Sequence, residues 1–253
     1  MIFDCYTATG HWPFRPVENQ TLPELRRHLT ALGIDGALVA STNAVFYIDP
    51  QSGNEELATA LAAEKNGYFY GCAGINPLLP RWEEDLRRCV SEWNFRAVRM
   101  TPLYHGYDHD GPEADALLEA AGAMDVPVLI PSRLTDFRGA QRLDVMTELW
   151  SEPARQAALR HPQTKVILVD ASLPYDGEKA PDNLYVEMSR IACSYNGHLP
   201  RLIEAIGADH VLFGSGAPLR EVEPALLKLG FLELSEADWQ LIAAGNAQRL
   251  FKL

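Results

Sequence analysis

Short apolar segments alternate with amphipathic segments from one end of the chain to the other. Eight of the apolar segments are mostly unbroken rather than alternating, which is typical of strands that are covered on both faces. The strands that this pattern predicts are Ile2–Cys5, Gly36–Ala40, Phe69–Ile75, Ala97–Thr101, Val126–Ile130, Lys165–Val169, Leu184–Met188 and His210–Phe213.

The segments between these strands repeat apolar residues at helical spacing and carry signals for helix starts. In the segment TLPELRRHLTALG, Thr21 and Glu24 have the spacing of a capping box. Asn54 is expected to cap the helix that follows it, and Ser235 with Asp238 is expected to cap the last helix.

Regular alternation of strand and helix predicts a parallel sheet, because right-handed crossovers place each helix on the face of the sheet. Eight such units in 253 residues favour a closed (β/α)8 TIM barrel over a doubly wound sheet. No G-x-G-x-x-G follows the first strand, and no Walker-type loop is present. No linker or repeat suggests a second domain, so residues 1–253 are expected to form one domain with its chemistry at the C-terminal strand ends.

Composition excludes several classes of partner. The formal net charge of −12, without a Lys/Arg stripe, argues against a nucleic-acid partner. No apolar stretch reaches the ~18 residues that span a bilayer, and no signal peptide is recognised, so we expect a cytoplasmic protein without a membrane partner. Phe231 and Leu232 are expected to be exposed and would suit a homodimer contact. The scattered cysteines are expected to be reduced thiols, Cys5, Cys72, Cys89 and Cys193.

Several segments at the strand ends carry a family resemblance. They are MIFDCYTATGHWPF, RAVRMTPLYHGY, KVILVDAS, NLYVEMS, HVLFGSGAPL and GNAQRLF, in this order. Over essentially its whole length the chain resembles the amidohydrolase superfamily, in the branch of small TIM-barrel hydrolases and decarboxylases. The resemblance implies a TIM barrel whose mouth binds a divalent metal such as zinc, through a His-x-His motif, two further histidines and an aspartate.

At the five positions that correspond to these ligands, the chain has other residues. Tyr6 and Ala8 stand at the His-x-His positions, and Pro131, Asp170 and Gly216 stand at the other three. Alanine, proline and glycine side chains offer no lone pair, and tyrosine is a poor zinc ligand at its ordinary pKa near 10. One carboxylate cannot hold a catalytic metal, which needs about three protein ligands. We therefore interpret the chain as a metal-free member and expect no cofactor.

Polar side chains at or just after the strand ends are candidates for a site that binds a small-molecule ligand. Asp170 and Glu187 are the candidate catalytic acid and base, since burial would raise their pKa values. Arg99 and Arg133 are expected to orient a carboxylated substrate through paired hydrogen bonds. The remaining candidate substrate-binding residues are Tyr6, His11, Tyr104, His105, Asp136 and Ser215.

These residues lead us to predict metal-independent hydrolysis or lyase chemistry on a small polar or carboxylated substrate, in a chain that is a hydrolase by descent. Two alternatives stay open. In the first, the chain is a pseudoenzyme that binds a small molecule or serves as a scaffold, with Asp170 and Glu187 paired to Arg99 or Arg133 in a structural network. In the second, His11, Asp170 and Glu187 hold a relocated metal.

Overall fold

A computed structural model describes residues 1–64, 67–136, 138, 141–145, 147, 151–171, 180–191 and 197–253. Its eight strands are parallel and neighbour one another in the order of the sequence. They are β1 (Phe3–Thr9), β2 (Gly36–Ser41), β3 (Phe69–Gly74), β4 (Ala97–Arg99), β5 (Val128–Pro131), β6 (Val166–Val169), β7 (Leu184–Glu187) and β8 (Val211–Leu212).

Backbone hydrogen bonds between β1 and the segment that follows β8 bring the two edges of the sheet together. The Cys5 N–H donates to the Phe213 carbonyl at 3.0 Å, and the Gly216 N–H donates to the Tyr6 carbonyl at 2.8 Å. The fold is therefore the (β/α)8 TIM barrel that the alternating pattern predicts.

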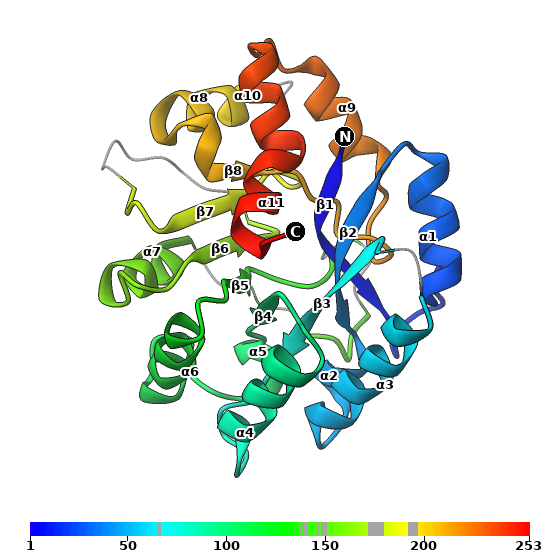
Figure 1. Cartoon of the computed structure of the whole chain (residues 1–253), viewed down its shortest axis with the longest axis vertical. Helices are drawn as coiled ribbons and strands as arrows, with labels where there is room; N and C mark the ends of the chain where they lie inside the picture. The colour runs from blue at the N-terminus through cyan, green and yellow to red at the C-terminus, as the bar shows by residue number, and fades with distance from the viewer. Residues whose placement is uncertain are drawn as a thin grey trace.

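Helices surround the strands in a ring (Figure 1). The α-helices are α1 (Leu22–Ala31), α2 (Asn43–Phe46), α3 (Pro50–Ala63), α4 (Trp82–Arg87), α5 (Pro102–His105), α6 (Pro112–Ala123), α7 (Ser151–Arg160), α8 (His198–Ile206), α9 (Glu223–Phe231), α10 (Glu236–Gln240) and α11 (Asn246–Phe251). The described residues also form two π-helical turns, η1 (Arg88–Glu92) and η4 (Leu241–Gly245), and the 3₁₀ turn η3 (Ala208–His210).

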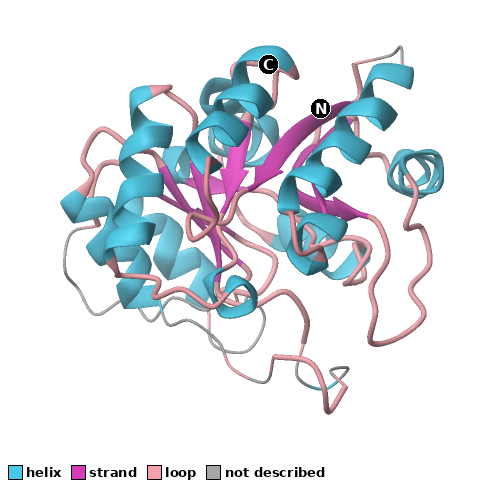
Figure 2. Ribbon diagram, turned by 90° about the horizontal axis from the view of Figure 1, so that it is seen from below, coloured by secondary structure: helices cyan, strands magenta, loops and turns pink. Residues whose placement is uncertain are grey.

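The last helix covers the N-terminal end of the barrel. Leu250 and Phe251 of α11 are buried in one apolar cluster with Phe3 of β1, and the Phe3 and Phe251 ring centroids lie 6.3 Å apart. Because this end is closed by packing, the opposite, C-terminal end of the strands is where a ligand has access. Figure 2 shows long loops gathered on the side away from both termini.

All eight predicted strands are confirmed, although β4 and β8 are each two residues shorter than predicted and His210 lies in η3 rather than in β8. β1 continues to Thr9, because Thr7 to Thr9 pair with β2 after a bulge between Asp4 and Thr7. The polar residues of this stretch suggest a loop in the sequence, yet Tyr6 and Ala8 are buried strand residues.

The helix-cap predictions are confirmed at two places and wrong at one. The Glu24 side chain accepts hydrogen bonds from the Thr21 backbone and hydroxyl, at 3.2 and 2.8 Å, and the Ser235 hydroxyl accepts from the Asp238 N–H at 3.1 Å. Asn54 does not cap a helix. It lies inside α3, fully buried, and its amide bonds both the N–H and the carbonyl of Gly74 at the end of β3.

Of the two apolar residues predicted to be exposed, Phe231 and Leu232, only Phe231 is. Phe231 is 75% exposed, as predicted, but Leu232 is only 8% exposed, because it packs into the main apolar cluster. Cys5, Cys72 and Cys89 are buried free thiols, whereas Cys193 lies outside the described residues. Within the described ranges, no helix combines the length and apolar character needed to cross a bilayer.

Candidate functional site

A pocket of about 440 Å³ opens at the C-terminal mouth of the barrel, between the segments that follow β5, β7 and β8. Its lining is rich in positive charge although the whole chain is acidic. The cationic side chains that line it are Arg133, Arg138, Arg190, Arg220 and Lys228, and the acidic ones are Asp136 and Glu221. Such a lining favours anionic ligands, because guanidinium groups hold carboxylates with paired, charge-assisted hydrogen bonds.

Asp170 lies directly after β6 and beneath this pocket. It is fully buried, and its backbone has a φ of 52°, a conformation that few residues other than glycine adopt and that is enriched at functional sites. Its Oδ1 lies 2.6 Å from Nη2 of Arg220, as an ion pair. Neither carboxylate oxygen accepts a hydrogen bond within the described part of the chain.

Burial is the main cause of the raised pKa of Asp170, which stands at about 7. The positive charge of Arg220 opposes this rise, and the negative charge of Glu187 adds to it. At neutral pH the carboxyl group therefore exists in both its protonated and its ionised form, which is the property that a general acid or base requires.

Glu187, the last residue of β7, lies beside Asp170 and is also fully buried. Its Oε2 accepts a hydrogen bond from the Ser189 hydroxyl at 2.9 Å and another from the Asp170 N–H at 3.2 Å. Its Oε1 accepts from the Ser189 N–H. Burial raises the pKa of Glu187, while the Ser189 hydrogen bonds oppose that rise.

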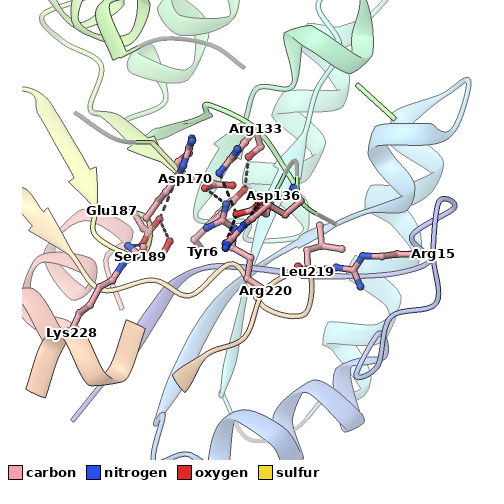
Figure 3. Close-up of polar contacts among 12 residues, drawn as sticks. Tyr6, Arg15, Arg133, Asp136, Asp170, Glu187, Ser189, Leu219, Arg220 and Lys228 are labelled. Atoms are coloured by element: carbon pink, nitrogen blue, oxygen red, sulfur yellow. Dashed lines mark hydrogen bonds and ion pairs between the residues drawn. The ribbon is translucent and has the colours of Figure 1, made fainter. Parts of the chain in front are cut away.

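Figure 3 shows how these groups converge. The side chains of Tyr6, Arg133, Asp136, Asp170 and Arg220 meet in one group, and Glu187 lies next to Asp170. The Tyr6 hydroxyl points to the Arg133 carbonyl at 3.5 Å, and burial raises the pKa of this tyrosine above its ordinary value. Asp170 and Glu187 do not line the pocket themselves; each contacts a residue that does, Arg220 and Ser189 respectively.

Ser215 connects the site to a third buried carboxyl group. Its hydroxyl donates to Asp4 Oδ2 at 2.5 Å, and its N–H donates to Asp4 Oδ1 at 3.0 Å. Burial raises the pKa of Asp4 to about 7 despite these hydrogen bonds. Since Asp4 is on β1 and Ser215 follows β8, the pair joins the two strands at which the barrel closes.

Arg133 and Asp136 both line the pocket, and they pair with each other through Nη2 and Oδ2 at 3.6 Å. Asp136 also accepts hydrogen bonds from Arg138, which hold the pKa of this carboxyl well below its ordinary value. Burial lowers the pKa of Arg133, and the neighbouring Arg190 lowers it further. The mutual repulsion of these guanidinium groups makes an anion between them favourable.

Arg99 is on β4, 2% exposed, and outside the pocket lining. Its Nη2 donates to the Ser41 carbonyl at 2.9 Å, and no carboxylate of the described residues pairs with it. The structural network that would pair Asp170 or Glu187 with Arg99 is therefore not formed, and the guanidinium that reaches Asp170 is that of Arg220.

Tyr104 and His105, both of α5, are held by the protein itself. The Tyr104 hydroxyl donates to Asp144 Oδ1 at 2.9 Å, and its ring packs against Phe46 and Trp12. The His105 Nε2 lies 3.2 Å from the Ala44 carbonyl, and burial lowers the pKa of this histidine to about 4. His105 is therefore neutral at physiological pH.

His11 is apart from the other candidates. Its side chain is exposed, and its backbone N–H donates to Asn43 Oδ1 at 3.1 Å. The structure does not bring His11 together with Asp170 and Glu187, so the relocated metal site is not formed. In the described part of the chain, the one cluster of three potential ligands is Asp108, His109 and Asp110, on a solvated loop.

Six of the predicted site residues meet at the mouth, namely Tyr6, Arg133, Asp136, Asp170, Glu187 and Ser215. The other four predicted residues, His11, Arg99, Tyr104 and His105, do not line the pocket. Sequence reasoning did not single out Asp4, Arg190, Arg220 or Lys228. No sequence motif marks these residues: Asp4 is one residue of the buried strand β1, Arg190 and Arg220 lie in the loops after β7 and β8, and Lys228 lies in α9.

The comparisons with known proteins agree with this architecture. A family model of amidohydrolases (Amidohydro_2) matches residues 9–253. The chain belongs to the amidohydrolase family. The resemblance seen in the sequence is thereby confirmed.

Several proteins that are similar to this amidohydrolase-family chain are decarboxylases by name. The gamma-resorcylate decarboxylase of Polaromonas sp. (strain JS666) is 27% identical over 217 residues, an alignment that spans 67% of this chain and only 65% of that relative. A dihydroxybenzoic acid decarboxylase of Polaromonas sp. JS666, solved with bound manganese and the inhibitor 2-nitroresorcinol, has a TM-score of 0.69 at 20% identity, with 100% of this chain and 97% of that chain covered.

A third similar structure is the 5-carboxyvanillate decarboxylase of Sphingomonas paucimobilis, with a TM-score of 0.74 at 15% identity over 100% of this chain and 99% of that one. At these identities the likeness of the two crystal structures establishes the fold alone. All three relatives are decarboxylases by name, and the gamma-resorcylate decarboxylase, which is matched by its sequence, favours the lyase half of the sequence prediction. They give no support to a hydrolase or to a pseudoenzyme.

Proposed function

We propose that this amidohydrolase-family chain is an enzyme that acts on a small aromatic carboxylic acid, as a decarboxylase, by acid–base catalysis without a bound metal. The observation that carries the proposal is the position of the cationic pocket directly above two buried carboxyl groups, Asp170 and Glu187. Its relatives' names supply the substrate class.

The pocket supports the part of the proposal that concerns binding. Its volume of about 440 Å³ is within the range of small-molecule sites. Arg133 and Arg220 offer guanidinium groups to a carboxylate, and Lys228 of α9 adds a further positive charge at its wall. An aromatic acid bound here places its ring toward Leu219 and Ala225, which line the same pocket.

The donor set at the mouth supports the metal-free part of the proposal. Tyr6 keeps its proton, since its pKa is raised. The Glu187 oxygens are engaged by Ser189, and Asp170 faces the Arg220 guanidinium, which would repel a second cation. The other three positions of the family's ligand set have no side-chain donor, namely Ala8, Pro131 and Gly216. These residues do not fit a divalent metal.

Asp170 is the proposed proton donor. When the substrate carboxylate leaves as CO₂, the bonding electron pair remains on the ring carbon, and a proton from the Asp170 carboxyl group forms the new C–H bond. Asp170 then recovers a proton from water. Glu187 holds the Asp170 backbone through its 3.2 Å hydrogen bond, and its negative charge favours the protonated form of Asp170.

The test is CO₂ release from aromatic acids, including 2,6-dihydroxybenzoate, by protein freed of metal with a chelator. We expect release by the wild type and at least a hundredfold loss in Asp170→Asn, in line with removal of a general acid. Arg133→Gln is expected to raise KM, whereas Arg27→Gln, which removes an exposed arginine of α1, changes net charge equally and should not. Equal turnover by the wild type and Asp170→Asn would refute the assignment.

A further inference from the structure

Arg220, which pairs with Asp170, lies in the loop that follows β8. Arg220 both lines the pocket and lies 2.6 Å from Asp170, so it connects the ligand space to the buried carboxyl group. Its side chain is 16% exposed, which leaves part of the guanidinium open to a ligand.

Gly216 determines where Arg220 can lie. The loop folds back on itself, since the N–H groups of Leu219 and Arg220 both donate to the Gly216 carbonyl, at 3.0 and 3.2 Å. A Cβ atom on Gly216 would lie 2.9 Å from Cδ of Arg220 and 3.4 Å from its Cγ. Arg220 therefore crosses the mouth through space that any other residue at position 216 would fill.

The same loop is anchored on both sides. The Gly216 N–H donates to the Tyr6 carbonyl at 2.8 Å, and Nη2 of Arg15 donates to the Leu219 carbonyl at 3.1 Å. Figure 3 shows Arg15 reaching Leu219, the residue before Arg220. The backbone around Arg220 is thus fixed, and a change at its guanidinium is a side-chain event.

We propose that Arg220 is the resident cation of this barrel mouth, that is, a positive charge of the protein itself that pairs with Asp170 when no ligand is bound. An anionic substrate then pairs with the Arg220 guanidinium in place of Asp170, and Asp170 takes up a proton from solvent. Position 216, where the family has a metal-binding aspartate, is glycine here so that this guanidinium has room. The proposal deepens the proposed function, on whose carboxylated substrate it rests.

The electrostatics of the pair give the direction of this coupling. The charges that act on Asp170 come from four neighbours on several elements, Arg220, Glu187, Arg133 and Arg190, while the nearby Tyr6 hydroxyl is neutral because its pKa is raised. Of these, Arg220 opposes the burial effect most strongly. A ligand carboxylate that engages Arg220 offsets this charge, and the loss of one close opposite charge raises a carboxyl pKa by about 1–3.

The first readout needs no turnover. Titration of the Asp170 side-chain carbon by NMR, assigned with Asp170→Asn, is expected to give a midpoint near pH 7 in the free wild type, the pKa of the buried carboxyl group. Arg220→Met should raise it by about 1–3 pH units, and Arg220→Lys should restore part of the difference. Addition of 2,6-dihydroxybenzoate to the wild type should raise it likewise, with uptake of roughly 0.4–0.9 protons per ligand at pH 8.

The glycine is tested with a matched pair. Gly216→Ala should raise the Asp170 midpoint as Arg220→Met does, whereas Gly33→Ala should leave it unchanged. Gly33 has almost the same φ, 78° against 80°, but nothing within 4 Å of the new Cβ, so it controls for backbone strain. If Gly216→Ala does not fold, the two Arg220 variants decide the matter.

Three results would overturn the inference: an unchanged Asp170 midpoint in Arg220→Met, binding of 2,6-dihydroxybenzoate without proton uptake, or no binding at millimolar concentration. Proton-linked binding without any CO₂ release would uphold Arg220 as the resident cation and refute the decarboxylase. CO₂ release together with an Asp170 titration midpoint that is the same in the wild type and in Arg220→Met would uphold the decarboxylase and refute the role of Arg220.

Discussion

Replacing Asp170 by asparagine should change how the stability of the protein depends on pH. A carboxyl group whose pKa is raised from 3.8 in the unfolded chain to about 7 in the folded one stabilises the fold at low pH, where both states hold the proton. That stabilisation is lost as the pH rises toward 7, because the unfolded chain releases its proton first. Full ionisation of the buried group costs about 4 kcal/mol, because a tenfold change in an acid dissociation constant corresponds to about 1.36 kcal/mol.

Most of this loss of stability occurs between pH 5 and pH 8, where the unfolding of the protein can be measured. Between pH 5 and pH 8 the two pKa values imply a decrease of about 2.5 kcal/mol in the free energy of unfolding from this residue alone. The asparagine variant, which is isosteric and neutral, should lack it. The assay is urea unfolding followed by tryptophan fluorescence at both pH values, and the quantity compared is the difference between them for each protein.

Asp136→Asn is the matched control. Its hydrogen bonds with Arg138 lower the pKa of Asp136, so the stability it contributes is present above the unfolded pKa and is lost only in acid. This variant should parallel the wild type from pH 5 to pH 8. If Asp170→Asn also parallels the wild type, Asp170 is ionised throughout this range and our account of its burial is wrong.

Three further substitutions test separate parts of the structure by the same unfolding assay. Ser215→Ala removes the 2.5 Å hydrogen bond to Asp4 and should destabilise the protein by about 1–3 kcal/mol at pH 8; no loss would show that this bond is unimportant. Asn54→Ala leaves the Gly74 N–H and carbonyl without their partner and should cost at least about 2 kcal/mol, whereas Glu55→Ala, on the exposed face of α3, should cost much less. Since the pKa of His105 is lowered to about 4, the wild type should lose stability as the pH falls from 6.5 toward 4, and His105→Gln should lose less; equal losses would contradict a buried neutral ring.

The fold was predictable because it depends on patterns that are local in the sequence. Most of the strands are short apolar runs, such as β5 and β6, whose residues are all buried, as expected for strands that are covered on both faces. β1 was predicted too short, because its last residues are polar and their pairing with β2 is a long-range event. Asn54 was misread for the same reason: its capping-type side chain is used across space, on Gly74 of β3.

The site was predictable only where it coincides with strand ends. Asp170 and Glu187 directly follow or close a strand, so their positions follow from the fold. Arg220 lies eight residues beyond Leu212, the end of β8, and reaches the mouth only because the loop turns back over Gly216. The sequence shows that Gly216 has no side-chain atom that could bind a metal, and the structure shows that the Arg220 side chain lies in the space next to it.

The central claim is that guanidinium groups and buried carboxyl groups act at this mouth without a divalent metal. The most direct measurement is CO₂ release from 2,6-dihydroxybenzoate and related acids by protein samples whose manganese and zinc contents have been set and determined by elemental analysis. We predict turnover that does not change with metal content and persists in chelated protein. Activity that rises in proportion to one tightly bound metal ion per chain would contradict the account.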